Sequence, residues 1–219
     1  KIAAVSADLQ PNAGKDVVTS LEKVYRSFFG RMSEWESAND ATYSFNGNLI
    51  ALKKSVIGEI TESIGPDDAN IAFVAIRKGY RTIYENDAKV YEELPVNMKK
   101  QYSQKARRAK GLIQATLANR DLLKLKRPFS RLFYPLRLSI YVVTPTIFFA
   151  GLLLFVMGMA VMHPAILLLL ILAVVILSII KRDNLITSFI TNQFYLFMGL
   201  YSRRKDAVIW QSTSKKVGE

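Results

Sequence analysis

The feature that most constrains this chain is residues 138–180, which contain no Asp, Glu, Lys or Arg in 43 positions. A helix needs roughly 20 apolar residues to cross the hydrocarbon core of a bilayer, so this stretch is long enough for two crossings. The break between them falls at His163-Pro164, because proline suits the first turn of a new helix. We therefore expect two transmembrane helices, 138–161 and 164–180. The rest of the chain is too short and too polar to bury such a pair inside a soluble protein.

Basic residues flank the apolar stretch on both sides. Five precede it, at Lys124, Lys126, Arg127, Arg131 and Arg137. Lys181 and Arg182 follow it, whereas the connection at His163 contains no Lys or Arg. The positive-inside rule places both ends of such a hairpin in the cytoplasm. We expect an integral membrane protein whose soluble part is cytoplasmic, in the cell membrane if the source is prokaryotic.

A third apolar segment, residues 185–201, admits two interpretations. On a helix its polar side chains share one face, at Thr187, Ser188, Thr191 and Asn192. Its apolar side chains share another face, at Ile186, Phe189, Ile190, Phe194 and Phe197. This amphipathic pattern favours a helix that lies in the membrane interface. The alternative is a third crossing, which would export the basic residues Arg203-Arg204-Lys205 against the charge rule.

Composition excludes several classes of protein. The chain is 50% hydrophobic, which excludes an intrinsically disordered protein. It has no cysteine and one histidine, which excludes a disulfide-stapled module, a cysteine protease and nearly every structural zinc site. Most of the net charge of +12 lies in residues 99–137, which carry 12 basic side chains and one acidic side chain.

Short strands alternate with helices before this basic segment, which indicates an α/β layer. Apolar spacing and turn signals predict strands at 2–6, 48–52, 82–85 and 88–91, and helices at 16–35, 55–63 and 67–78. We expect Asp67 or Asp68 near the N-cap of the helix at 67–78, and Gly79 just past its end.

A long basic helix is predicted from residue 97 to residue 126. Gln104, Arg107, Arg108 and Gly111 fall at i, i+3, i+4 and i+7, so they share one face of this helix. Glycine on that face would let a backbone or a ligand approach closely. The two guanidiniums and the amide would suit phosphate oxygens. The alternative role for the arginine pair is contact with lipid headgroups.

Taken in order, these motifs carry a family resemblance. They are an acid pair, a Gly-Tyr strand, a segment ending in proline and a Gln-x-x-Arg motif, at Asp67-Asp68, Gly79-Tyr80, Val90-Tyr91-Glu92-Glu93-Leu94-Pro95 and Gln104–Arg107. Followed by paired membrane helices, they resemble the C-terminal part of a membrane-bound family 2 glycosyltransferase. That group includes hyaluronan, chitin and cellulose synthases and dolichyl-phosphate sugar transferases. The resemblance implies an α/β, partial GT-A-like domain followed by a transmembrane helical hairpin and an interfacial helix.

The resemblance also implies roles for individual residues. Asp68 matches the family's general base, which takes the proton of the acceptor hydroxyl, and Asp67 matches its partner acid. If the resemblance did not hold, both would simply cap a helix. Asn46 and Gly47 match a turn that lines the acceptor side, with a plain turn as the alternative.

Gln104, Arg107 and Arg108 match the family's Gln-x-x-Arg-Trp motif beside the donor diphosphate and the acceptor. Arg108 stands at the tryptophan position, which removes an aromatic platform for an acceptor sugar. This departure favours a single transfer over processive polymerisation.

The family's Asp-x-Asp metal motif has no counterpart before Asp67, and Asp8-Leu9-Gln10 is not such a motif. We therefore expect no metal site in this chain. A divalent metal, Mg or Mn, is implied by the family, with ligands mostly outside the chain. The donor-binding half would come from a missing N-terminal part or from a second chain. We expect four regions: a catalytic half-domain at 1–96, the basic segment at 97–137, the membrane hairpin at 138–182, and an interfacial helix with its tail at 183–219.

The predicted function is transfer of a sugar from a nucleotide-sugar donor to a lipid or glycan acceptor by an inverting enzyme. The alternative is a membrane-anchored module that binds anionic lipid and a protein partner without catalysis. Basic helices also attract nucleic acid. That function is disfavoured here, because the basic segment adjoins a bilayer and lacks interleaved aromatic residues.

Overall fold

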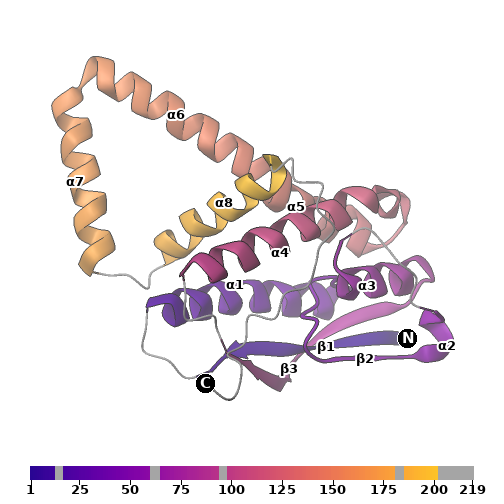
Figure 1. Cartoon of the computed structure of the whole chain (residues 1–219). Coiled ribbons are helices and arrows are strands. Elements are labelled where there is room, and N and C mark those ends of the chain that lie inside the picture. Colours follow the sequence, from indigo (N-terminus) through magenta and orange to yellow (C-terminus); the bar gives the residue numbers. More distant parts are fainter. Residues whose placement is uncertain (13–16, 60–64, 94–97, 181–184, 202–219) are drawn as a thin grey trace.

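The computed structural model describes residues 1–12, 17–59, 65–93, 98–180 and 185–201. A small sheet forms one side of the molecule, and helices are stacked on it in layers (Figure 1). Helices α1 (Val17–Asn39) and α3 (Asp67–Arg77) pack directly on the sheet. Helices α4 (Met98–Ala118) and α8 (Leu185–Tyr201) form the next layer, and α6 (Thr144–Met162) and α7 (Pro164–Ile180) extend away from it.

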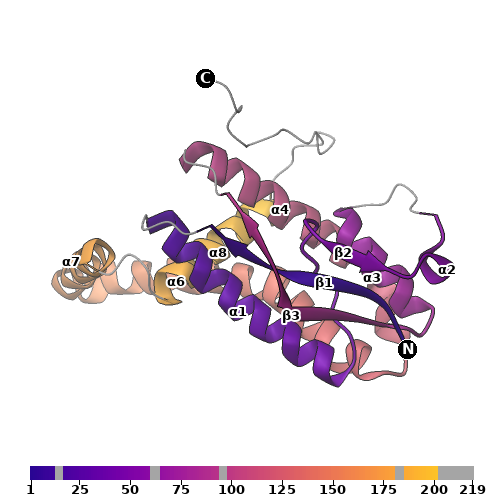
Figure 2. The same cartoon turned by 90° about the horizontal axis from the view of Figure 1, so that it is seen from below.

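The sheet has three strands in the order β2-β1-β3 (Figure 2). The central strand β1 (Ile2–Pro11) pairs antiparallel with β2 (Ile50–Leu52) and parallel with β3 (Arg81–Glu92). The sequence predicted two separate strands at 82–85 and 88–91. That prediction is wrong, because β3 is one continuous strand. The register jumps within it: Ala7 pairs with Glu85, but Asp8 pairs with Lys89. A bulge therefore replaces the predicted interruption at Asn86-Asp87.

The predicted helix at 67–78 is confirmed as α3, whose first turn contains Asp67 and Asp68. Gly79 follows it with φ of 78°, a left-handed conformation typical of a helix C-terminus. The helix predicted at 55–63 is much shorter in the described residues, as α2 (Lys54–Ile57); residues 60–64 lie outside them.

The basic helix was predicted to reach residue 126, which is wrong at its C-terminal end. Helix α4 stops at Ala118, and a 3₁₀ turn, η1 (Arg120–Lys124), follows. The amide of Asn119 donates to the carbonyl of Ala115 at 2.7 Å, and Arg77 from α3 forms an ion pair with Asp121 at 2.8 Å. The helix ends at this point, and the ion pair attaches the turn that follows to α3.

The long apolar helix begins nearer the soluble part than the sequence predicted. It runs from Phe129 to Met162 through η2 (Phe129–Phe133), α5 (Tyr134–Leu138), η3 (Ser139–Val143) and α6, where η2 and η3 are π-helical turns. Among the described residues it is the one helix long and apolar enough to cross a membrane. The predicted break at His163 is confirmed, and α7 follows it. Membrane crossing by both helices stays a prediction.

Helix α8 lies on α4 and α1 through its small and polar side chains. A Cβ on Gly199 would lie 3.0 Å from the backbone nitrogen of Lys110, so the two helices cross closely. The Ser188 hydroxyl donates to the carbonyl of Leu21 at 3.5 Å. Phe189 and Phe194 are exposed on the outside. The helix is amphipathic as predicted, and its place in a membrane interface stays a prediction.

A fully buried ion pair fastens the long helix to the soluble domain. Arg137 contacts both carboxylate oxygens of Glu36 in α1, at 2.6 and 3.0 Å. Its remaining donors reach the hydroxyls of Ser33 at 3.1 Å and Tyr141 at 2.8 Å. A buried pair with all its partners in place fixes one geometry, because loss of either charge leaves the other uncompensated.

We predict that Arg137→Leu lowers the free energy of unfolding by about 3–5 kcal/mol, because Glu36 would remain buried without its partner. In a chain of this size such a loss corresponds to a fall in melting temperature on the order of 10 °C. The measurement is thermal unfolding of the detergent-solubilised protein. Arg131→Leu is the matched control, since Arg131 lies on the same helix but is exposed. Equal melting temperatures for both variants would contradict the anchoring role.

Candidate functional site

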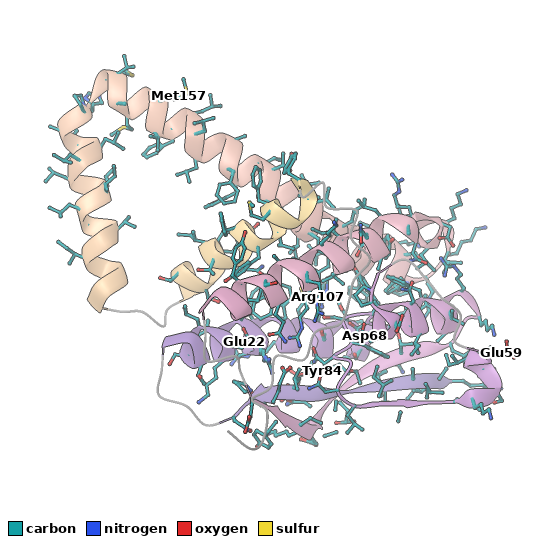
Figure 3. The ribbon with its side chains drawn as sticks, in the orientation of Figure 1. Glu22, Glu59, Asp68, Tyr84, Arg107 and Met157 are labelled. Carbon is teal, nitrogen blue, oxygen red and sulfur yellow. The ribbon has the colours of Figure 1, made fainter. Side chains whose placement is uncertain are left out.

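A cavity of about 580 Å³ lies where α1, α3, α4 and the turn before β2 meet. Figure 3 shows Arg107, Asp68 and Tyr84 between α4 and the sheet. Six of the seven residues proposed from the sequence line this one cavity: Asn46, Gly47, Asp67, Asp68, Arg107 and Arg108. They come from three separate segments, so the fold brings together what the motifs singled out. Gln104 is half-buried on α4 and is not among the lining residues.

The N-terminus of α3 positions Asp68 at the cavity. Its Oδ1 accepts a hydrogen bond from the backbone N–H of Ala69 at 2.8 Å. A Cβ built on Gly47 would lie 3.5 Å from its Oδ2, so the turn at Gly47 borders this second oxygen. Glycine thus leaves the oxygen open to a small group in the cavity. Asp67 is exposed beside it.

The pKa of Asp68 lies above its usual value of 3.8. Burial is the main cause, because removal from water disfavours the charged form. The hydrogen bond from Ala69 and the positive charge of Arg108 lower the pKa, and the charge of Asp67 raises it. A half-buried carboxylate with a raised pKa is a stronger base than one in water, which is what proton abstraction needs.

A close helix crossing sets the distance between α4 and the acid pair. A Cβ on Gly111 would lie 3.3 Å from the ring of Pro66, the residue before Asp67. Gly65, with φ of 90°, leaves no room for a side chain either, since its Cβ would lie 2.6 Å from the carbonyl oxygen of Gly111. The predicted close approach at Gly111 is therefore confirmed, and the neighbour is backbone and proline.

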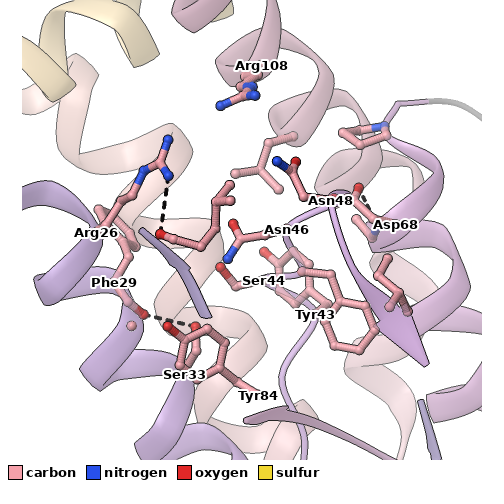
Figure 4. Close-up of a pocket in the computed structure, with 18 of the residues that line it drawn as sticks. Arg26, Phe29, Ser33, Tyr43, Ser44, Asn46, Asn48, Asp68, Tyr84 and Arg108 are labelled. Atoms are coloured by element: carbon pink, nitrogen blue, oxygen red, sulfur yellow. Dashed lines mark hydrogen bonds between the residues drawn. The ribbon is translucent and has the colours of Figure 1, made fainter. Parts of the chain in front are cut away.

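Ion pairs line the opposite wall of the cavity. Arg26 of α1 forms ion pairs with Glu22 and Glu92, both at 2.8 Å. No sequence pattern singles this arginine out. Glu22 also contacts Lys105 at 2.5 Å, and Glu92 contacts Arg108 at 3.1 Å. Burial alone would raise the pKa of Glu22, but the charges and hydrogen bonds of Lys105 and Arg26 hold it below its usual value. Figure 4 shows Arg26 across the cavity from Asp68.

Asp8 also reaches the cavity, with both carboxylate oxygens engaged. It accepts a short hydrogen bond from the hydroxyl of Tyr84 and a second from the amide of Gln10 at 2.7 Å. Among the described residues, no group of three or more His, Cys, Asp and Glu side chains could hold a metal ion. The described residues therefore do not form a cluster of metal ligands.

Several aromatic side chains of the cavity were not singled out from the sequence, among them Tyr25 and Phe29 from α1 and Tyr141 from the long helix. All three stood on apolar helical faces, where burial in a core is the usual expectation. Tyr141 belongs to the helix that is apolar enough to cross a membrane, so the cavity reaches that helix.

Comparison with known proteins supports the same family. Residues 1–180 match the family model described as "Glycosyl transferase family group 2", which is most of the chain. The chain belongs to this family. No curated protein is similar enough in sequence to count as a match.

The fold of this glycosyltransferase chain also resembles that of a solved structure. That structure is mannosyltransferase PcManGT from Pyrobaculum calidifontis in complex with GDP-Man and Mn²⁺. The TM-score is 0.67 at 22% sequence identity, and the match covers 91% of this chain. This chain spans about half, 52%, of that protein's chain. At this identity the likeness shows the fold, which supports the predicted GT-A-like architecture.

Proposed function

We propose that this chain is the acceptor-side part of a membrane-bound, inverting glycosyltransferase that transfers a sugar from a nucleotide-sugar donor to a lipid or glycan acceptor. The observation that carries the proposal is the position of Asp68: a half-buried carboxylate with a raised pKa in a cavity that also contains Arg107 and Arg108. Membership of the family supports the reaction class. The GDP-Man bound to the structural neighbour supports a nucleotide-sugar donor.

Asp68 acts as the general base in this proposal. As the acceptor hydroxyl oxygen attacks the anomeric carbon, Asp68 takes its proton, and the bond from that carbon to the nucleoside diphosphate breaks. The attack from the opposite side inverts the anomeric configuration. The oxygen Oδ2 suits this step, because Oδ1 already accepts the hydrogen bond of Ala69 and Oδ2 faces the open turn at Gly47.

Arg107 and Arg108 bind the anionic groups of the substrates. A guanidinium offers several N–H donors in one plane, which matches phosphate oxygens. Gln104 lies one turn before these arginines on the same face of α4 and supports their role in binding. Arg108 at the tryptophan position favours a single transfer, since no aromatic platform holds a growing chain there.

In this proposal the acceptor reaches the cavity from the membrane. The cavity includes Tyr141 of the long apolar helix, so an acceptor carried in the bilayer could reach Asp68 along that helix. We place the hairpin across the membrane, α8 in the interface and the soluble domain in the cytoplasm. The charge pattern that flanks the hairpin supports this orientation.

The donor's nucleotide and a divalent metal, Mg or Mn, are held mainly outside this chain in the proposal. The neighbour's complex with Mn²⁺ supports a metal for the family fold. The described residues of this chain provide no fitting ligand cluster, so no step here depends on the metal.

We predict that Asp68→Asn lowers the transfer rate by a factor on the order of 10²–10⁴, because asparagine cannot accept the proton. The melting temperature should not fall. Since the folded-state pKa of Asp68 is raised, its ionised form destabilises the fold above that pKa, and asparagine removes this cost while it keeps an oxygen for Ala69. The measurements are sugar transfer by the complete enzyme in membranes and a thermal melt. Full activity would reject the proposed base, and a large drop in melting temperature would assign Asp68 to a capping role.

A second prediction compares two basic residues. Arg107→Ala should weaken donor binding or transfer several-fold or more, because charge-assisted hydrogen bonds contribute roughly 1.5–3 kcal/mol each. Lys124→Ala should have little effect, since lipid-headgroup contacts contribute on the order of 1 kcal/mol. Both variants are assayed for KM and kcat in the complete enzyme. Equal effects would favour the lipid-binding alternative.

A third prediction concerns topology. Because this chain contains no cysteine, His163→Cys and Ser202→Cys each introduce a single label site into it. An impermeant thiol reagent applied to intact cells should label position 163 and leave position 202 unmodified. Labelling at 202 from outside would mean that the segment 185–201 crosses the membrane.

A further inference from the structure

Glu92, the last residue of β3, has a carboxylate that joins two helices at the cavity wall. Its Oε2 contacts Arg26 of α1 at 2.8 Å, and its Oε1 contacts Arg108 of α4 at 3.1 Å. Its side chain is 18% exposed, and Glu92 is not among the residues that line the cavity. It therefore touches no cavity occupant directly and acts through the two arginines, which do line the cavity.

The two arginines depend on Glu92 to different degrees. Arg26 is also held by Glu22 at 2.8 Å and by the carbonyl oxygen of Leu9 at 3.2 Å, so it keeps two partners without Glu92. Arg108 has a side chain that is 46% exposed, and Glu92 is its hydrogen-bond partner in the described residues. Loss of the Glu92 charge should therefore release Arg108 and leave Arg26 in place.

Arg108 lines the same cavity as the carboxylate that we assign as the base. Its charge acts on Asp68 from α4, whereas Asp67 acts on Asp68 from α3 with the opposite sign. Arg107 lines the same cavity. Figure 4 shows Arg108 extending from α4 above Asn46 and Asn48, between Arg26 and Asp68 in this view.

We propose that Glu92 is a positioning residue for sugar transfer, which holds the Arg108 guanidinium over the cavity so that it can bind an anionic group of a substrate beside Asp68. This inference rests on the proposed function. The anionic group is a phosphate or diphosphate oxygen, from either the donor or the acceptor. One oxygen of Glu92 accepts a hydrogen bond from one nitrogen of the guanidinium, and Arg108 lines the cavity where its other N–H donors can serve a ligand.

The test is a double-mutant cycle with Glu92→Gln and Arg108→Gln in the complete enzyme. Glutamine keeps the size of Glu92 but removes its charge. Glu92→Gln should lower kcat/KM about tenfold, the scale of one charge-assisted hydrogen bond. In the Arg108→Gln background the same change should cost less than about twofold, because Glu92 acts through Arg108. Glu93→Gln, an exposed neighbour, is the matched control and should behave as wild type.

Separate KM values for the donor and for the acceptor distinguish the source of the anion. An increase in KM for the nucleotide-sugar alone would assign the group to the donor. An increase in KM for the acceptor alone would assign it to a phosphate of the acceptor. Either result supports the proposal.

The pH profile separates positioning from a direct charge effect. If Arg108 moves away from Asp68 in Glu92→Gln, the pKa of Asp68 rises and the acidic limb of kcat/KM shifts to higher pH. If Glu92 acted only through its own negative charge, its removal would shift that limb to lower pH.

Additive effects in the cycle, or wild-type kinetics in Glu92→Gln, would overturn the role of Glu92. The proposed function is judged separately, because sugar transfer by the wild-type enzyme and its loss in Asp68→Asn do not involve Glu92. If Glu92→Gln fails to fold, Glu92→Asp replaces it in the cycle. Aspartate keeps the charge for Arg26 but is one methylene too short to hold Arg108 as well, so the same loss and the same coupling to Arg108 are expected.

Discussion

The contact between Gly111 and Pro66 sets the geometry on which the cavity depends. With only 3.3 Å between the position of a Cβ on Gly111 and the proline ring, α4 can pack no closer to the turn before α3, and a side chain at 111 would push it away. Protein interiors are packed densely enough that such a shift is transmitted to neighbouring side chains. Arg107 and Arg108 lie one turn before Gly111, so this contact determines how far their guanidiniums stand from Asp67 and Asp68.

Electrostatics then divides the cavity into two sides. On the α1 side, Arg26 is neutralised by Glu22 and Glu92. On the α3 side, Asp68 has no ion pair among the described residues, and its burial raises its pKa. A carboxylate paired directly with arginine would have a lowered pKa and would be a poor base. The separation of the paired wall from the lone carboxylate is therefore what makes proton abstraction by Asp68 chemically reasonable.

Much of this arrangement could be predicted from local sequence. The acid pair, the turn at Gly47 and the glycine on the basic helix were identified because turn residues and helical spacing act over a few positions. The bulge in β3 and the end of α4 at Ala118 were not predicted, since both depend on partners far away in the chain, β1 and α3 respectively. Arg26 and Tyr141 were also missed. Spacing along a helix does not by itself distinguish a residue that lines a cavity from one in a packed core.

A structure of the enzyme with donor and acceptor bound, determined by electron cryomicroscopy, would test the central claim most directly. The account predicts that the acceptor hydroxyl lies within about 2.6–3.2 Å of the Asp68 carboxylate, the range needed for proton transfer. The anomeric carbon of the donor should lie on the far side of that hydroxyl, with the diphosphate beside Arg107. An acceptor bound outside this cavity, with another carboxylate next to its hydroxyl, would contradict the account.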